Sequence, residues 1–491
     1  MLFNSYIFIF LFLPVVLAGY YGFNYINKYK LSLCWLIVMS MLFYGYDYNA
    51  TSVRYMVVLM VSILLNYGLV KILSKVSVML WRRILLVFGL LLNLGILFYF
   101  KYYDFFIENI NGVLGTDIGL LRVMLPLGIS FYTFQQLSYV IDSYKRECEP
   151  YSLLEYAAYV SFFPQLVAGP IVYHDELIPQ LRDKKNHVLN YTNLSKGIYA
   201  FALGLAKKVL IADTFSKVVT IGYGNIGDLN AVSVLILMVC YTMQIYFDFS
   251  GYCDIALGIG YLFNVELPLN FNSPYKAASI VEFWGRWHMT LTRFFTKYVY
   301  IPLGGSRKGI IRRYVNILIV FLVSGIWHGA NWTYILWGVI NGIGNVIEKI
   351  FGRFFRWVPR AVGVAVTFIF CLFSMSLFRA ESITQARQLW RHLKVAGDGV
   401  LYRPMTDAFN DLVEVKLLCK IGLDGIVRQY PGILLAAFSL IVLAACFFMK
   451  NTQEKIAQMR YSVRQIIVVI VLMLWSILTL SDVSEFLYFN F

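Results

Sequence analysis

The sequence predicts an all-α protein that crosses a membrane many times. Of its 491 residues, 59% are hydrophobic and only 14% are charged, whereas about a quarter of a soluble domain is charged. Apolar segments of about 18–22 residues recur, which is the length that a helix needs to cross a bilayer. Strands of membrane β-barrels alternate apolar and polar residues, so these uninterrupted apolar runs exclude a barrel.

We expect about 11 transmembrane helices, with re-entrant and interfacial helices, around a central tunnel. Residues 151–173 contain Pro164 and the break Ala168-Gly169-Pro170 between two basic flanks, which predicts a re-entrant segment lining a funnel. Residues 257–313 are amphipathic, rich in Gly and Pro, and end in a basic cluster, which predicts interfacial helices. The expected spans lie near residues 5–23, 31–47, 55–73, 84–103, 123–142, 209–224, 231–250, 314–330, 332–350, 361–379, 432–449 and 465–480.

The positions of Lys and Arg predict which side each loop faces. The net charge is +15, and cytoplasmic loops carry such an excess of Lys and Arg. The charge alternation along the chain then places both the N-terminus and the C-terminus outside the cytoplasm. Tyr6–Ala18 has no basic residue before it, so we expect a first span and no cleaved signal peptide. Because the basic residues lie in loops between apolar spans, we expect the lipid bilayer, and no nucleic acid, as a partner.

The cysteines and histidines predict neither a disulfide framework nor a metal site. The seven Cys form no CxxC pair and no other metal-binding spacing. Neither His288 nor His328 has an acidic residue at ligand spacing beside it. We therefore look for chemistry that needs no metal.

His328 is the strongest candidate for a catalytic residue. It lies in the apolar run 321–337, and a titratable group at membrane depth is a functional candidate. Imidazole has a pKa near neutrality, so His328 suits a general base; the alternative is a core histidine bonded to a helix carbonyl. His288, in the aromatic run Phe283–His288, either positions a substrate or anchors an interfacial helix. Each has a tryptophan neighbour, Trp327 and Trp287 respectively.

The other three histidines are weaker candidates. His174 follows the Gly-Pro break and could line the funnel. His187 lies among Lys and Asn, which predicts a solvated side chain, and His392 is expected at a surface position. Neither of these two is expected to act in catalysis.

Several polar residues are candidates for positioning. Gln244 and Asp248 lie in the segment Gln244–Asp254, at or near membrane depth, with a helix break expected at Gly251. Asp248 and Asp254 have two interpretations. In a structural role, each caps a helix or pairs with an Arg. In a functional role, they hold a polar channel or orient a histidine. Asn331 is expected on the same turn as His328, at i+3. Two further residues, Arg307 and Lys308, follow a Gly/Pro-rich run and are expected to steer an anionic donor.

The aromatic tail Phe486–Phe491 follows the last expected span. Tryptophan and tyrosine gather at membrane interfaces, so the tail either returns to the interface or inserts into the protein. In the second case it presents the hydroxyl of Tyr488.

Two motifs together resemble the membrane-bound O-acyltransferases. They are Phe283–Gly305 (FWGRWHMTLTRFFTKYVYIPLGG) and Ser324–Tyr334 (SGIWHGANWTY). Supporting pieces are LPLGISFYTFQQLSYVIDSY, FPQLVAGP and QIYFDFSG. The match is to the bacterial branch with alginate, peptidoglycan and cellulose acetylation subunits and the D-alanyl transferase of teichoic acids. One departure is Thr296-Lys297, which stands where many members have Arg-Asp.

The resemblance implies a reaction and a division of the chain. It implies that His328 is the essential histidine, His288 the second motif histidine, and Tyr488 a carrier of the acyl group. It also implies acetyl-CoA as cytoplasmic donor, an extracytoplasmic SGNH-type partner, a polysaccharide acceptor and a bacterial cytoplasmic (inner) membrane. Residues 1–104 would be N-terminal transmembrane helices, 105–380 the catalytic core, and 381–491 an extracytoplasmic segment, two last spans and the tail.

Three alternatives remain open at this stage. The first is transfer of another acyl group, such as D-alanyl to teichoic acid. The second is a transporter, which the many spans and Asp248 and Asp254 would suit, although no inverted repeat is visible. The third is a non-catalytic scaffold of a glycan export complex.

Overall fold

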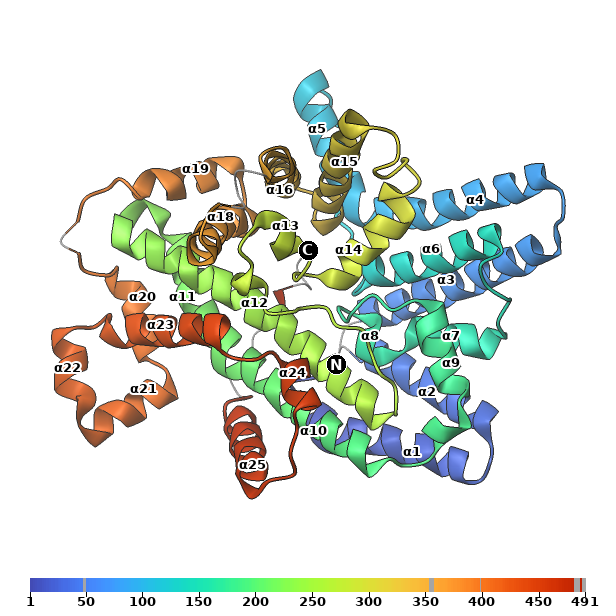
Figure 1. Cartoon of the computed structure of the whole chain (residues 1–491), viewed down its shortest axis with the longest axis horizontal. Helices are drawn as coiled ribbons and strands as arrows, with labels where there is room; N and C mark the ends of the chain where they lie inside the picture. Colours follow the sequence, from blue (N-terminus) through green and yellow to red (C-terminus); the bar gives the residue numbers. More distant parts are fainter. Residues whose placement is uncertain (47–49, 353–356, 398, 481–485, 488–491) are drawn as a thin grey trace. The chain divides into compact units, whose positions relative to one another are not determined.

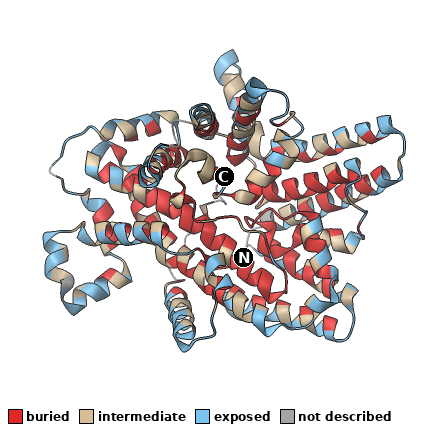
Figure 2. Ribbon diagram, viewed as in Figure 1, coloured by how far each residue is buried: buried red, intermediate tan, exposed pale blue. Residues whose placement is uncertain are grey.

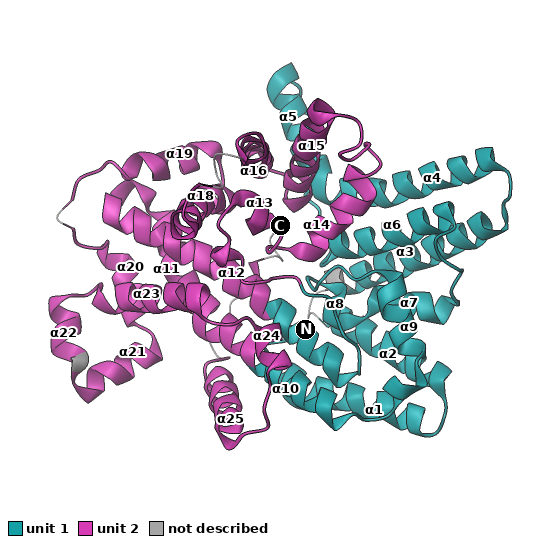
Figure 3. Ribbon diagram, viewed as in Figure 1, with its two compact units in different colours: residues 1–202, 252–269 teal, residues 203–251, 270–491 magenta. Residues whose placement is uncertain are grey.

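The computed structural model describes residues 1–46, 50–352, 357–397, 399–480 and 486–487. These residues form helices and connecting loops without a β-strand (Figure 1), which confirms the all-α prediction. The chain divides into two compact units, residues 1–202 with 252–269 and residues 203–251 with 270–491 (Figure 3). Each unit is described by itself.

Unit 1 begins with a group of long apolar helices. Helix α2 packs against α1, and both α3 and α4 pack against α6. The contact between α3, α4 and α6 contains a buried amide network, in which Asn66 donates to Gln136 at 2.9 Å and Asn93 donates to Asn66 at 2.7 Å. The bounds are η1 Phe8–Phe12, α1 Leu13–Tyr25, α2 Tyr29–Gly45, α3 Ala50–Lys75, α4 Met79–Leu97, η2 Phe98–Tyr102, α5 Tyr103–Leu114 and α6 Ile129–Lys145.

The chain between residues 151 and 173 is broken, as the sequence predicts. Helix α7 (Leu153–Ser161) ends at Phe162, the short α8 (Phe163–Leu166) follows, and residues 167–173 are irregular before α9 (His174–Arg182) and η3 (Lys184–His187). Nearly all of residues 156–174 are buried. Irregular backbone at membrane depth needs such a protein cover, so this segment meets that condition.

The longest helix, α12 (Ala231–Leu262), is buried along most of its length (Figure 2). It follows α10 (Tyr191–Ala206), η4 (Lys207–Ala212), α11 (Asp213–Gly224) and η5 (Ile226–Asp228). The predicted break at Gly251 is wrong, because α12 continues through it. A Cβ at Gly251 would lie 2.9 Å from the Gly204 carbonyl oxygen and 3.1 Å from the Lys208 nitrogen. Glycine is therefore needed there for close packing of two helices and not for a turn.

The remainder of unit 2 contains the two histidine motifs. Helices α15 and α16 form a hairpin, and α16 also packs against α13 and α18. The bounds are η6 Pro274–Lys276, α13 Ile280–Trp284, α14 Met289–Phe295, η7 Thr296–Tyr300, α15 Ile310–His328, α16 Trp332–Ile350, α18 Arg360–Arg379, α19 Ile383–His392, α20 Arg403–Asn410, α21 Val413–Leu418, η8 Cys419–Leu423, α22 Asp424–Gln429, α23 Ile433–Phe448, α24 Thr452–Ala457 and α25 Val463–Leu478.

Six helices in the described part of the chain are long and apolar enough to cross a membrane. Three shorter apolar helices, Tyr29–Gly45, Ile433–Phe448 and Val463–Leu478, match further expected spans. The structure therefore supports a multi-pass chain, and the count of about 11 spans stays a prediction.

The α15–α16 hairpin depends on two glycines at the crossing. A Cβ at Gly338 would lie 2.4 Å from the Phe321 carbonyl oxygen and 3.2 Å from the Gly325 Cα. We predict that Gly338→Ala destabilises the detergent-solubilised protein by about 1–3 kcal/mol, the usual cost of overpacking. Thermal unfolding measures this. The control is Gly95→Ala on α4, where nothing lies within 4 Å of the added Cβ; equal stability loss in both variants would contradict the close crossing.

Candidate active site

His328 is the last residue of α15 and lies in an aromatic cage. Only 3% of it is exposed. The rings of Trp327, Trp337 and Phe378 lie 4.9, 5.0 and 5.0 Å from its ring. Gly329 follows in an extended conformation, and a Cβ there would lie 2.3 Å from the Tyr334 ring. The small residue predicted beside His328 therefore lets an aromatic ring pack against the chain.

His288 lies at the N-cap of α14, and its backbone is left-handed, with φ 45°. Non-glycine residues adopt this conformation rarely, and it is often found at functional sites. His288 Nδ1 lies 3.1 Å from Asn270 Oδ1, which also accepts from the Thr290 backbone N–H at 3.2 Å. A side-chain amide oxygen carries no proton and can only accept, so the histidine nitrogen is the donor. The proton is thus on Nδ1, and Nε2 carries the lone pair.

The structure brings the two motif histidines together. Their ring centroids are 6.4 Å apart, and the Trp327 ring lies 6.1 Å from His288. Burial lowers the pKa of His288 to about 3, so its ring is neutral at pH 7 and a poor base. This division suits His328 as the base and His288 as a hydrogen-bonding residue.

Three other predicted residues, Trp287, Gln244 and Asp248, are also buried in unit 2. Trp287 stacks on Phe283 at 5.5 Å. The buried Gln244 has no hydrogen-bond partner for its Oε1 among the described residues. Asp248 is buried and pairs with Lys208 at 2.8 Å, so its partner is a lysine and not the expected arginine. The second acidic residue, Asp254, is half-buried and lies in the part of α12 that belongs to unit 1.

Asn331 is not placed as the sequence suggests. Helix α15 ends at His328, and Asn331 is the N-cap of α16, where its side chain accepts from the Thr333 N–H at 3.0 Å. It also donates to the Glu381 carbonyl oxygen at 2.9 Å. The expectation of a shared helical turn is therefore wrong, because the Gly329 break separates the two residues.

The remaining histidines are held by local partners. His174 in unit 1 is buried, with Nε2 3.2 Å from Asp142 Oδ2 and Nδ1 3.0 Å from the Tyr151 hydroxyl. His187 is half-buried, stacks on Tyr29 and bonds to the Leu181 carbonyl at 2.8 Å. His392 is also half-buried, and its Nδ1 donates to the Leu229 carbonyl at 2.8 Å. His187, expected to be solvated, and His392, expected at the surface, are therefore each only partly exposed.

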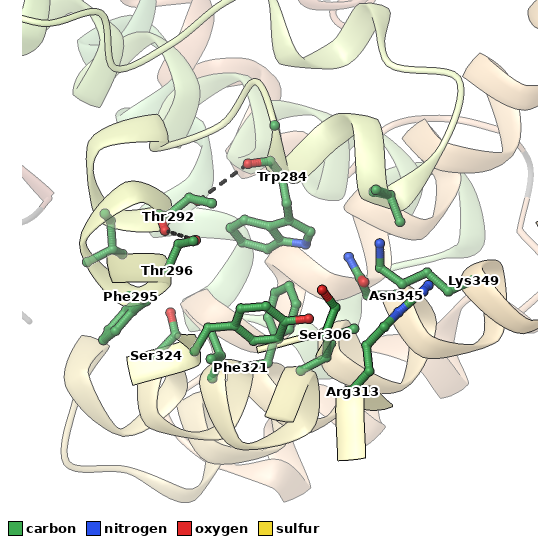
Figure 4. A pocket seen from close by; sticks show the side chains of 16 residues that line it. Trp284, Thr292, Phe295, Thr296, Ser306, Arg313, Phe321, Ser324, Asn345 and Lys349 are labelled. Carbon is green, nitrogen blue, oxygen red and sulfur yellow. Dashed lines mark hydrogen bonds between the residues drawn. The ribbon is translucent and has the colours of Figure 1, made fainter. Parts of the chain in front are cut away.

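A cavity of about 530 Å³ opens beside the hairpin. Figure 4 shows Arg313, Asn345 and Lys349 on one side of it, with Trp284 in the middle and Thr292, Thr296 and Phe295 on the other side. Ser324 also lines it, and Ser324 lies one helical turn before His328 on α15. The Trp284 ring contacts Trp337 at 5.5 Å, and Trp337 contacts His328. The cavity thus extends from two cations to Trp284, which packs against one ring of the His328 cage; the cage residues themselves do not line it.

The cations of this cavity are not the two singled out for donor steering. Arg307 and Lys308 are exposed and do not line it. Arg313 and Lys349 do, although Lys349 lies 36 residues further along the chain than Arg313. The basic cluster that ends residues 257–313 contains Arg313, and Lys349 lies in the basic stretch 349–360, but the sequence does not single out Lys349 for binding the donor.

The described part of the tail lies inside unit 2. Phe486 is 1% exposed, and its ring centroid is 4.6 Å from Lys208 Nζ. This agrees with the inserted alternative for the tail. Tyr488 itself lies outside the described residues.

Comparison with known proteins decides the family. The model of the membrane-bound O-acyltransferase family matches residues 120–383, a range that contains both histidine motifs. The chain belongs to the membrane-bound O-acyltransferase family. It is therefore an O-acyltransferase, and the site around His328 and His288 is the candidate active site of a membrane enzyme.

Relatives of this O-acyltransferase carry more specific names. The peptidoglycan O-acetyltransferase of Helicobacter pylori is 40% identical over 79% of this chain and 78% of the relative. The probable alginate O-acetylase of Pseudomonas putida is 37% identical over 81% of each chain. The teichoic acid D-alanyltransferase of Bacillus subtilis is 27% identical over 52% of this chain and 69% of the relative. Similarity is thus higher and longer for the two acetylation enzymes.

Proposed function

We propose that this O-acyltransferase moves an acetyl group from cytoplasmic acetyl-CoA to an extracytoplasmic acceptor, with His328 as the base. The acetyl group then passes through the Tyr488 hydroxyl to a partner of SGNH type, which acetylates a cell-surface or secreted polysaccharide. The names of the Helicobacter and Pseudomonas relatives support acetyl as the group and polysaccharide as the final acceptor. The expected location is the cytoplasmic membrane, with both termini outside.

The observation that carries the proposal is the cavity that extends from the cations to Trp284, whose ring contacts Trp337 of the His328 cage. Arg313 and Lys349 lie at the ends of α15 and α16 that the charge distribution assigns to the cytoplasm. From Arg313 to His328 the helix rises about 22 Å at 1.5 Å per residue. A donor with phosphates at the cations and an acyl thioester at the cage fits this arrangement, because Arg and Lys bind phosphates and apolar walls accept an alkyl chain.

The chemistry needs a base, a leaving group that regains a proton, and a donor for the oxyanion. His328 takes the proton from the acceptor hydroxyl while the hydroxyl oxygen attacks the thioester carbonyl carbon. The carbon–sulfur bond then breaks, and the thiolate takes the proton from the imidazolium. Among the described residues, the Trp337 indole N–H has no hydrogen-bond partner, and its ring packs on His328. It is the candidate donor to the carbonyl oxygen, which gains negative charge in the transition state.

D-alanyl transfer is the second candidate, and the Bacillus relative is its support. Acetyl-CoA carries phosphates of its own, and the two cations of the cavity favour such a donor. Thiol release from acetyl-CoA by the purified chain, together with its partner, distinguishes the two donors.

Removing the two cavity cations tests the donor site. We predict that Arg313→Ala with Lys349→Ala raises KM for acetyl-CoA at least roughly tenfold and leaves kcat nearly unchanged, because a charge-assisted hydrogen bond contributes about 1.5–3 kcal/mol. Thiol release at varied acetyl-CoA concentration measures both constants. The single variant Arg313→Lys keeps the positive charge, so its KM for acetyl-CoA should lie between that of the wild type and that of the double alanine variant.

The comparison variant is Arg307→Ala with Lys308→Ala. These exposed cations act at a distance, so their effect should be smaller and should vanish at high salt. A larger rise in KM from this pair than from the cavity pair would contradict the placement of the donor in the cavity.

A further inference from the structure

We infer that Asp248 is a positioning residue that holds the C-terminal tail beside the active site. It does so as part of a buried cluster with Lys208 and Asp213, here called the tail anchor. The inference rests on the proposed function, in which the tail carries the acetyl group. The contacts of the anchor stand independently of that function.

Asp248 uses its two carboxylate oxygens for two different partners. Oδ1 accepts from Lys208 Nζ at 2.8 Å, and Oδ2 accepts from the backbone N–H of Leu487 at 3.0 Å. The same ammonium donates to Asp213 Oδ1 at 2.8 Å. The carboxylate thus connects a cation fixed on η4 to the backbone of the tail.

The anchor is closed to solvent. Lys208 is 0% exposed, and Asp248 and Asp213 are also buried. Phe486 covers the cluster, with its ring 4.6 Å from the ammonium, within the range of a cation–π contact. Residues 486 and 487 are therefore held both through a side chain and through the main chain.

The geometry of the carboxylate explains the role of the backbone N–H. Lys208 binds Oδ1 of Asp248, and the second oxygen, Oδ2, is bonded by the tail. Burying an ion is costly unless each oxygen is hydrogen-bonded, and a hydrogen bond to an ionised acceptor is about twice as strong as a neutral one. The Leu487 N–H meets this requirement and, because a main-chain group makes the bond, it fixes the path of the backbone.

The anchor is close to the second motif histidine. Phe249 follows Asp248 on α12, and its ring packs edge-on against His288 at 4.9 Å. The last described tail residue is thus bonded to the same turn of α12 that packs against His288. Tyr488, which lies outside the described residues, is the next residue in the chain after the anchored Leu487.

Two measurements on the full chain in detergent test the anchor. The first is hydrogen exchange at the Leu487 amide in the wild type and in Asp248→Asn. The ammonium of Lys208 can only donate, so the amide oxygen of the introduced asparagine turns toward it. The amide NH₂ then faces the Leu487 N–H. Because both groups are donors, the hydrogen bond to Leu487 is lost. We expect exchange to become at least about tenfold faster. The control is Asp424→Asn, whose carboxylate forms an exposed pair with Arg428 and should leave exchange unchanged.

The second measurement separates the backbone bond from the side chain. Leu487→Pro removes the N–H, whereas Leu487→Ala keeps it. We expect acetyl transfer by the proline variant to lose at least tenfold in kcat with KM for acetyl-CoA unchanged, and the alanine variant to keep most of its activity. Thermal unfolding of both variants checks that the proline variant is folded, because a smaller folded fraction would also lower the apparent kcat.

The outcomes distinguish the tail anchor from the proposed passage of the acetyl group through the Tyr488 hydroxyl, here called the relay. Unchanged Leu487 exchange in Asp248→Asn, or equal activity in the proline and alanine variants, would overturn the positioning role. A protected Leu487 amide with no acetyl label on wild-type Tyr488 would instead overturn the relay and leave the anchor in place.

Discussion

Replacing His328 with alanine is expected to lower the rate of acetyl transfer at least roughly 100-fold, the lower range for loss of a general base. His328 is the only residue of α15 in the aromatic cage that can accept a proton, and His288, with its pKa lowered to about 3, cannot replace it. The assay is thiol release from acetyl-CoA by the chain with its partner in vesicles. His328→Gln, which keeps a polar side chain of similar reach, should be as inactive as the alanine variant.

The control for this prediction is His187→Ala, because His187 is half-buried on η3 and stacks on Tyr29. Its activity should match that of the wild type. A transporter or a scaffold would tolerate loss of His328, so wild-type rates in a folded His328→Gln protein would contradict acyl transfer at this site.

Replacing Tyr488 with phenylalanine is expected to abolish acetylation of the final acceptor. Phenylalanine keeps the aromatic ring and removes only the oxygen that would carry the acetyl group, so the loss should reach the detection limit. Acetylation of the polysaccharide by the chain with its partner measures this. The KM for acetyl-CoA should stay within about twofold of the wild type, since phenylalanine keeps the aromatic ring and the donor phosphates are expected at Arg313 and Lys349.

Tyr430→Phe is the matched control, because Tyr430 is exposed and lies outside the cavity and the anchor. A pure scaffold would retain acetylation in both tyrosine variants. Full acetylation by Tyr488→Phe, with the complex intact, would therefore remove the relay from the proposed function.

The sequence predicts the features that depend on local pattern. The apolar runs predict the long helices, and Pro164 and Gly169 predict the break in the segment 151–173. The density of aromatic residues around His288 and His328 marked the residues that the fold brings to a ring distance of 6.4 Å. These features are encoded in neighbouring residues, so no knowledge of the fold is needed to find them.

Features that depend on contacts between distant segments were missed or misread. Gly251 has the sequence of a break, but the close approach of Gly204 makes it a packing position. Asn331 stands three residues after His328, but the extended Gly329 ends the helix between them. Asp248 pairs with Lys208, 40 residues earlier in the chain, and nothing in the local pattern of either residue indicates the other.

The most direct test of the acetyl route is mass spectrometry of the C-terminal peptide after incubation with isotopically labelled acetyl-CoA. The wild-type chain and His328→Gln are compared, each with and without the partner. We predict labelled acetyl on Tyr488 of the wild type, a lower steady-state level when the partner consumes it, and no label in His328→Gln. Two results would contradict this account. In the first, Tyr488 stays unlabelled while the partner acetylates its acceptor. In the second, Tyr488 is labelled equally in the wild type and in His328→Gln.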